Sequence, residues 1–344
     1  MKLLRNKILI SIVVVAHDRK EFILEAIRSI EYQTADKTKF EVIVIKKFVD
    51  KEIDRVINSL GFVNIFTDEN SLSMKIIKAA QHCTGDFISF LEDDDLFTEN
   101  KIDEILKIIL KYPEILYIHN WHTTIDLMGN KRGFSLGIAP RADIILDLKN
   151  AKYHKLTKIL KYNPDFNLSS ITIRKSLIDA TSNALSSVDY LIDTFMFLTA
   201  IDSKKGLIYI GKDSLTLFRY YRKKGMTVVP ENGKTKDSMI TFIRTQYSAE
   251  QTLISKFRED KVRKLLASRI SEDKVKLALL GYEFSSGLEA SDFLILFLYA
   301  FASQKLYKFK VLLLGFYYLI NRERAISIYY NSNLVKSHDH PDIQ

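Results

Sequence analysis

The sequence predicts an α/β fold with a mostly parallel sheet that has helices on both faces, followed by a C-terminal helical region. Through the first 120 residues, apolar runs rich in β-branched residues alternate with amphipathic stretches, which is typical of βαβ units. From Asp237 onward the pattern is helical throughout. The 344 residues, 47% of them hydrophobic, suffice for a sizeable core. We therefore divide the chain into a domain at 1–225 and a helical region at 226–344.

The strands of this sheet are expected where short apolar runs end at turns or polar residues. These runs are Ile10–Ala16, Glu41–Ile45, Val63–Phe66, Phe87–Leu91 and Ile115–His119, with further extended runs at Ser170–Arg174 and Leu207–Gly211. Between the first five we expect helices at Arg19–Tyr32, Lys51–Leu60, Ser73–Cys83 and Thr98–Lys111. In the first helix, apolar residues from Phe22 to Ile30 recur at helical spacing and predict a buried stripe.

Charge and cysteine usage limit the partners and the compartment. The net charge of +9 is spread over both parts of the chain and the basic runs are short, so we expect no nucleic acid partner. Cys83 is the only cysteine, which excludes an internal disulfide and favours the reducing cytoplasm. Lys2, Arg5 and Lys7 before an apolar run resemble a secretion signal, but the run is short and lacks a small-residue cleavage site.

Two apolar runs near the C-terminus, Phe293–Ala302 and Val311–Ile320, are each about half the length that crosses a bilayer as a helix. The favoured interpretation is a core helix pair that covers the first domain. The alternative is an apolar surface in a membrane interface, because Lys305, Lys308 and Lys310 flank it. On that alternative the protein is peripheral to the membrane, at the inner face of the cell membrane.

Four consecutive acids, Glu92, Asp93, Asp94 and Asp95, directly follow the apolar run Phe87–Leu91. Like charges repel, and a folded protein tolerates such a cluster mainly where a cation or a partner offsets it. Ligand sites in open α/β sheets lie at the carboxyl ends of strands. The cluster therefore predicts a metal site. An acidic helix start is the alternative, and it explains one carboxylate but not four.

Two segments resemble family 2 glycosyltransferases, which have the GT-A fold, a Rossmann-like fold of nucleotide-diphospho-sugar transferases. One begins SIVVVAHDRKEFILEAIRSI at Ser11, and the other is GDFISFLEDDDLF from Gly85 to Phe97. The resemblance covers about residues 9–225. It implies a metal-dependent inverting glycosyltransferase that moves a sugar from a nucleotide diphosphate donor to a hydroxyl of a glycan, polysaccharide or lipid-linked acceptor. The alternative is a catalytically inactive GT-A protein that binds nucleotide or glycan.

The resemblance also implies roles for residues of the two segments. Asp94 falls on the principal ligand of a divalent cation, Mn²⁺ or Mg²⁺, and Asp95 on a second or water-mediated ligand. Glu92 and Asp93 lie where the family contacts nucleotide and ribose. The first loop lies where the family holds the nucleotide, with candidates Ala16, His17, Asp18, Arg19 and Glu21. His17 either stacks on the base or is structural.

The remaining roles fall later in the chain. Asp193 aligns best with the family's catalytic base, with Asp189 as the fallback, and capping of the following helix is the alternative for either acid. Candidates for the acceptor and sugar pocket are Trp121, Asn167, Ser169, Ser170 and Arg222. Lys46 and Lys47 stand where relatives have an acidic segment that reads the base, so the sequence leaves the donor base open.

Overall fold

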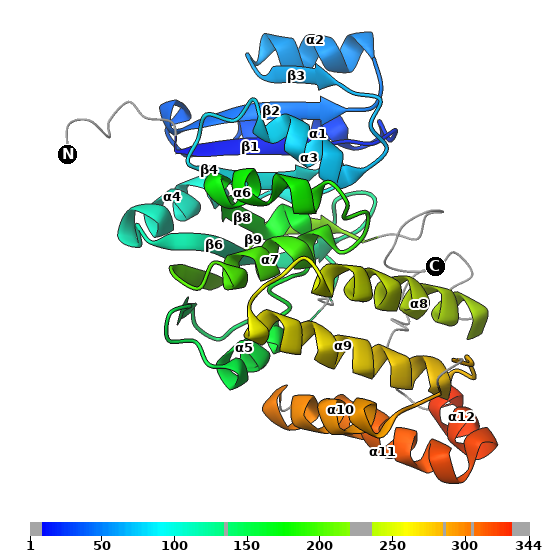
Figure 1. The fold of residues 1–344 in the computed structure, drawn as a ribbon. Coiled ribbons are helices and arrows are strands. Elements are labelled where there is room, and N and C mark those ends of the chain that lie inside the picture. The colour runs from blue at the N-terminus through cyan, green and yellow to red at the C-terminus, as the bar shows by residue number, and fades with distance from the viewer. Residues whose placement is uncertain (1–8, 134–136, 221–235, 285–286, 304–305, 332–344) are drawn as a thin grey trace. The chain divides into compact units, whose positions relative to one another are not determined.

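The computed structural model describes residues 9–133, 137–220, 236–284, 287–303 and 306–331 (Figure 1). Within these ranges the chain forms two compact units. Unit 1 contains residues 9–151 and 162–220, and unit 2 contains residues 152–161 and the chain from 236 onward. The expected division at residue 225 falls between 221 and 235, outside the described residues.

Unit 1 is built on a mixed sheet in the order β3-β2-β1-β4-β8-β6-β9-β5, with β7 paired to β9. The strands are β1 (Ile10–Val15), β2 (Phe40–Lys46), β3 (Val63–Phe66), β4 (Phe87–Glu92), β5 (Leu96–Phe97), β6 (Ile115–Ile125), β7 (Ile144–Asp147), β8 (Ile171–Arg174) and β9 (Leu207–Arg219). The first four strands of this order are parallel to one another. β8 lies antiparallel between β4 and β6.

The helices of unit 1 are α1 (Ile23–Glu31), α2 (Lys51–Ser59), α3 (Leu72–Ala80), α4 (Lys101–Lys111), α6 (Lys175–Leu185) and α7 (Ile192–Asp202). Short 3-10 turns occur at Lys37–Lys39 and Leu168–Ser170, and a third, Leu160–Tyr162, lies where the chain passes from unit 2 back to unit 1. The start of α2 is fixed by Asp50, whose carboxylate accepts hydrogen bonds from the backbone amides of Glu52 and Ile53. The expected apolar stripe of α1 is buried at Ile23, Ala26, Ile27 and Ile30.

The register of the parallel strands places their carboxyl ends together. All six residues of β1 are buried, as expected of a parallel strand that is covered on both faces. Val15, the last residue of β1, lies opposite Ile45 of β2 and Glu92 of β4. The loops after β1 and β4 therefore leave the sheet side by side. At the opposite, amino ends of the two strands, Gly85 allows a close approach, since a Cβ there would lie 2.7 Å from the backbone nitrogen of Ser11.

Several boundaries differ from the expected ones, and the differences bear on the site. Strand β6 continues to Ile125 rather than His119, and β9 continues to Arg219 rather than Gly211. Helix α1 begins at Ile23 rather than Arg19, so residues 16–22 form a loop at the end of β1. Polar contacts from Arg19 to the carboxylates after β4, described below, hold this loop outside the helix.

All the regular secondary structure described in unit 2 is helical. Its helices are α5 (Tyr153–Ile159), α8 (Lys236–Ile254), α9 (Asp260–Leu279), α10 (Ala290–Ser303), α11 (Leu306–Ile320) and α12 (Arg322–Asn331). Helix α9 contacts all five of the others. Within the described ranges we find no helix that combines the length and the apolar character needed to cross a membrane.

Candidate functional site

The acidic cluster lies at the carboxyl end of β4, as its place in the sequence predicts. Asp93, Asp94 and Asp95 have side chains that are almost entirely buried, with residue exposures of 2%, 5% and 1%. Glu92 closes the strand and is half-buried. Four carboxyl groups thus lie together at the sheet edge instead of spreading into solvent.

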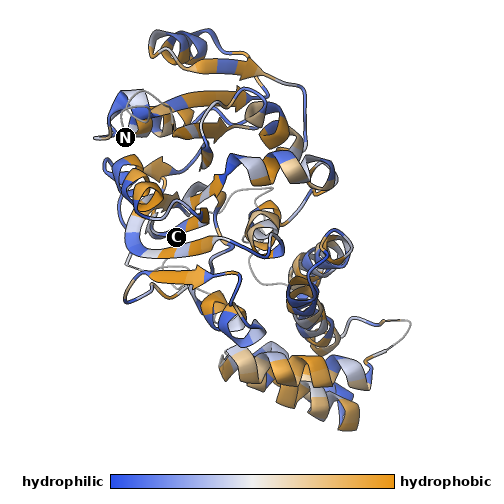
Figure 2. Cartoon of the chain, turned by 60° about the vertical axis from the view of Figure 1, so that its left-hand side comes forward, coloured by the Kyte–Doolittle hydropathy of each residue, from blue (hydrophilic) through white to orange (hydrophobic). Residues whose placement is uncertain are grey.

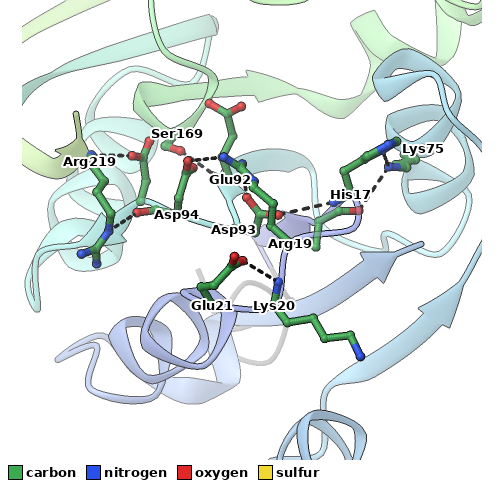
Figure 3. A network of polar contacts seen from close by, with 12 residues as sticks. His17, Arg19, Lys20, Glu21, Lys75, Glu92, Asp93, Asp94, Ser169 and Arg219 are labelled. Atoms are coloured by element: carbon green, nitrogen blue, oxygen red, sulfur yellow. Dashed lines mark hydrogen bonds and ion pairs between the residues drawn. The ribbon is translucent and has the colours of Figure 1, made fainter. Parts of the chain in front are cut away.

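Arg19, from the loop after β1, reaches across to this cluster (Figure 3). Its Nη1 donates to Asp94 Oδ2 at 2.6 Å, and its Nη2 pairs with Asp93 Oδ1. The backbone amide of His17 also donates to Asp93 Oδ2, at 3.4 Å. The structure therefore brings the predicted nucleotide loop and the predicted metal-binding segment into direct contact.

Arg219, the last residue of β9, also contacts the acidic turn. The sequence analysis did not select this residue. Its backbone amide donates to Asp95 Oδ1 at 2.9 Å and its Nε donates to the carbonyl of Asp94 at 2.8 Å. Its guanidinium is fully buried, lies 4.3 Å from the ring centroid of Phe22 and donates to Glu25 Oε2. The turn is thereby fixed in one conformation.

Crowding and burial shift the proton affinities of the cluster. Burial raises the pKa of Asp93 to about 6, against the opposing charge of Arg19. Burial, and then the charge of Asp94, raise the pKa of Asp95 to about 8. The pKa of Glu92 is raised well above its usual value by burial and by the charges of its neighbours. Binding of a cation in place of protons would stabilise the charged form of these carboxylates.

The donor set suits a hard divalent cation that is shared with a substrate. Asp95 Oδ2 is buried and has no hydrogen-bond partner among the described residues, so one carboxylate oxygen is left over. In the described part of the chain, no three His, Cys, Asp or Glu side chains are arranged to hold a metal by themselves. Mg²⁺ and related ions are typically held by one or two carboxylates, substrate phosphates and water. The carboxylates of Asp94 and Asp95 fit that role.

The loop after β1 also contacts Lys75, a residue that the sequence analysis did not select. Lys75 of α3 is buried, and its Nζ lies 2.7 Å from His17 Nδ1 and 3.2 Å from the carbonyl of Ala16. An ammonium group can only donate, so Nδ1 accepts and the ring proton of His17 lies on Nε2. Burial lowers the pKa of Lys75 to about 8 and, with the charge of Lys75, lowers that of His17.

The other candidates in this loop face outward. Asp18 is exposed. Glu21 is exposed as well, and its Oε2 accepts from the backbone amide of Lys20 at 3.1 Å. The charge of Asp18 acts on His17 and Lys75.

Lys46, the last residue of β2, and the adjacent Lys47 have different environments. Lys46 is buried, with Nζ 2.7 Å from Asp54 and 3.0 Å from the carbonyl of Phe48. Lys47 extends to Asn70 Oδ1. Lys46 is thus held by the fold, whereas Lys47 and Asn70 remain near the strand end as candidates for contacts with a nucleotide.

Asp193, the candidate base, lies in the first turn of α7 and is half-buried. Its Oδ1 accepts from the amide of Thr194 at 2.9 Å. The helix is preceded by Leu191 in the left-handed region, at φ 62°, which is uncommon for such a residue and sets where α7 starts. The charge of Asp193 contributes to the raised pKa of Glu92, so the two acids lie within electrostatic range. Asp189 is exposed.

The segment before β8 packs directly behind the acids. Asn167 caps the short 3-10 turn by accepting from the amide of Ser169 at 2.9 Å. Ser169 Oγ accepts from the amide of Glu92 at 3.0 Å, and its carbonyl accepts from Lys101, which is fully buried. Ser170 is buried, and its Oγ has no hydrogen-bond partner among the described residues.

Trp121 is buried among other rings. Trp121 is 7% exposed, and its ring stacks on His122 at a centroid distance of 4.8 Å. Both ring nitrogens of His122 are buried without a hydrogen-bond partner in the described part of the chain. Arg222 lies outside the described residues.

Comparisons with known proteins identify the family and the fold of the chain. The family described as "Glycosyl transferase family 2" matches residues 11–170. This range includes the loop after β1 and the acidic turn after β4, but not Asp193 or Arg219. A Haemophilus influenzae protein named "uncharacterized glycosyltransferase" is 30% identical over 245 residues, which is 70% of this chain and 77% of the relative.

Solved structures with a similar fold include the first 349 residues of TarS from Staphylococcus aureus. Its complex with UDP-GlcNAc has a TM-score of 0.55 at 13% identity, and the match covers 96% of this chain and 91% of TarS 1-349. Its complex with UDP has a TM-score of 0.54 at 13% identity, and the match covers 98% of this chain and 96% of TarS 1-349. These matches establish a GT-A-like fold. The Haemophilus relative and the family match show that the chain belongs to glycosyl transferase family 2 and is a glycosyltransferase.

Proposed function

We propose that the chain is a metal-dependent, inverting glycosyltransferase that moves a sugar from a nucleotide diphosphate donor to a hydroxyl acceptor. The observation that carries this proposal is the buried carboxylate turn, Asp93–Asp95, held against the loop after β1 and left with one unpartnered oxygen. The UDP and UDP-GlcNAc complexes of TarS support a nucleotide-sugar donor.

The cation would be held by Asp94, with Asp95 as a second or water-mediated ligand. When bound, Mn²⁺ or Mg²⁺ neutralises the charge that builds on the leaving diphosphate. Arg19 is the residue that changes partner in this scheme. It pairs with Asp93 and Asp94 here, and a donor diphosphate beside it offers phosphate oxygens that suit its planar fork.

The acceptor hydroxyl requires a general base, and Asp193 is the group proposed for it. A carboxylate on the first turn of a rigid helix keeps a fixed position relative to the sheet end. Removal of the proton on the side of the sugar opposite the diphosphate gives in-line displacement and inversion. The electrostatic link between Asp193 and Glu92 supports a position beside the acidic turn.

The test compares Asp193→Asn with Asp202→Asn, which makes the same change at the far end of α7. Transfer or hydrolysis is followed on a panel of UDP-, CDP-, GDP- and dTDP-sugars with Mn²⁺. We expect Asp193→Asn to lose roughly a hundredfold or more in turnover and to keep nucleotide binding, with Asp202→Asn unaffected. Loss in Asp189→Asn instead would move the role of base to Asp189.

A catalytically inactive binder is the second candidate. If the unaltered protein binds a nucleotide diphosphate but turns over none of these donors, with or without acceptor, the binder interpretation replaces transfer. We further propose that the chain works in the reducing cytoplasm on a glycan or lipid-linked acceptor, with the domain boundary near residue 225.

A further inference from the structure

The helices α10 and α11 are packed on one side only. On the inner side, Phe293, Leu296 and Tyr299 of α10 are buried. Helix α11 approaches α9 so closely at Gly315 that a Cβ there would lie 2.8 Å from Val275 Cγ1. These contacts fill the core of unit 2 and fix the orientation of both helices.

The other side of the pair exposes large apolar side chains, which we call the α10–α11 face. Its members are Leu294, Phe297, Leu298, Phe301, Leu306, Tyr307, Leu313, Phe316, Leu319 and Ile320. Their exposures run from 37% at Tyr307 to 83% at Ile320. Figure 2 shows α10 and α11, the lowest helices in the view, as largely hydrophobic. Large exposed apolar side chains gathered on two neighbouring helices are typical of an interaction site.

Charge is nearly absent from this face. Asp292 is buried and paired with Lys274 at 2.8 Å, and Lys308 is buried and paired with Glu272. Among the described residues of the two helices, Lys310 is the one exposed charged side chain. It follows Leu306 by four positions and precedes Leu313 by three, so it lies within the apolar stripe of α11.

Lys310 distinguishes between a second copy of the chain and a lipid surface as the occupant. If two such faces packed together, each Lys310 would leave water with no exposed acid on α10 or α11 to pair with it. On a bilayer, the lysine stem lies along the apolar surface while its ammonium group reaches the lipid phosphates.

The lengths of α10 and α11 decide whether the two helices could cross a bilayer or only lie on it. Helices of 14 and 15 residues are each about 21–23 Å long at about 1.5 Å per residue, which is less than the roughly 30 Å of a hydrocarbon core. Neither helix is long enough to span that core, so a bilayer would take up the pair lying in the plane of the interface. We propose that the α10–α11 face docks unit 2 onto an anionic lipid bilayer, with apolar side chains inserted and Lys310 on the phosphates.

Vesicle flotation of the full chain tests this without any nucleotide, so its outcome is separate from that of the transfer assay. The probes are phosphatidylcholine vesicles with and without phosphatidylglycerol. The double variant Phe301→Asp with Leu313→Asp changes side chains that are 71% and 67% exposed, so the fold is kept, and thermal unfolding verifies this. Leu110→Asp, at 62% exposure on α4, is the matched control.

The unaltered protein and the control are expected to float with the anionic vesicles, and the double variant to lose roughly tenfold or more in partitioning. Lys310→Glu should weaken binding to anionic vesicles and leave the weaker binding to neutral ones unchanged. The proposal is overturned if the unaltered protein stays with the soluble fraction, or if the double variant floats like the control. A dimer in sedimentation velocity that the double substitution dissociates, without lipid binding, would assign the face to a second copy.

Discussion

Replacement of Arg219 by methionine tests whether one buried side chain holds the acidic turn in place. The side chain donates hydrogen bonds to the carbonyls of Asp94, Asp126 and Leu127 and to Glu25 Oε2. Methionine fills most of the volume but leaves these acceptors without their donor. At a net value of about 1 kcal/mol for each hydrogen bond, the loss is about 3–5 kcal/mol.

This loss converts into a measurable shift of the melting temperature. A domain of roughly 150–250 residues shifts by about 2–4 °C per kcal/mol, so we expect Arg219→Met to lower Tm by about 6–20 °C. Arg219→Lys keeps the charge but not the planar fork, and its loss should be about half as large. Arg322→Met, which changes an exposed arginine in unit 2, serves as the control and should leave Tm unchanged.

The assay is thermal unfolding followed by circular dichroism, with a binding titration on the Lys variant. Because Arg219 fixes the backbone of Asp94 and Asp95, Arg219→Lys should also weaken metal-dependent nucleotide binding by roughly tenfold or more. If Arg219→Met melted within about 2 °C of the unaltered protein, the buried network would carry little stability and the reasoning would fail.

Two further predictions concern charges at other positions. Arg19→Gln removes the cation that pairs with Asp93 and Asp94, so Mn²⁺ measured alone by electron paramagnetic resonance should bind roughly three- to tenfold tighter. Nucleotide diphosphate should bind more weakly to this variant, and an unchanged Mn²⁺ affinity would contradict the partner exchange. In unit 2, burial, and then the charge of Asp273, raise the pKa of Glu250, whose Oε2 has no partner among the described residues. The stability that comes from protonated Glu250 is fully present below the pKa of this group in the unfolded chain. It decreases as the pH rises toward the higher pKa in the folded protein. Glu250→Gln should therefore raise the urea midpoint more at pH 8 than at pH 5.

The strands and the acidic site follow from local sequence. A parallel strand that is covered on both faces has apolar residues at every position. Such strands can therefore be recognised in the sequence as continuous β-branched runs, as at Ile10–Ala16. The place of the acids directly after such a run predicted a site at the sheet edge, and the register of β1 with β4 brings the first loop beside it. The family resemblance then indicated which chemistry this edge supports.

Other parts depend on contacts between residues far apart in the sequence. The antiparallel insertion of β8 between β4 and β6 leaves no local pattern, because pairing of distant strands is decided by the whole sheet. Arg219 joins the acidic turn from about 125 residues away. Buried lysines are uncommon, so Lys75 and Lys101 were missed. The available signal was their spacing, since each lies four residues before a buried apolar residue of its own helix, Ala79 and Ile105 respectively.

We propose that the carboxylate turn would hold a divalent cation together with a donor diphosphate. Isothermal titration of UDP, CDP and GDP into the protein, in Mn²⁺ and in EDTA, tests it directly, with Asp94→Asn beside the unaltered chain. We predict that one nucleotide binds at least tenfold tighter with Mn²⁺ than in EDTA, and that Asp94→Asn removes this difference. Equal affinity in Mn²⁺ and EDTA, or a metal effect that survives in Asp94→Asn, would contradict the claim.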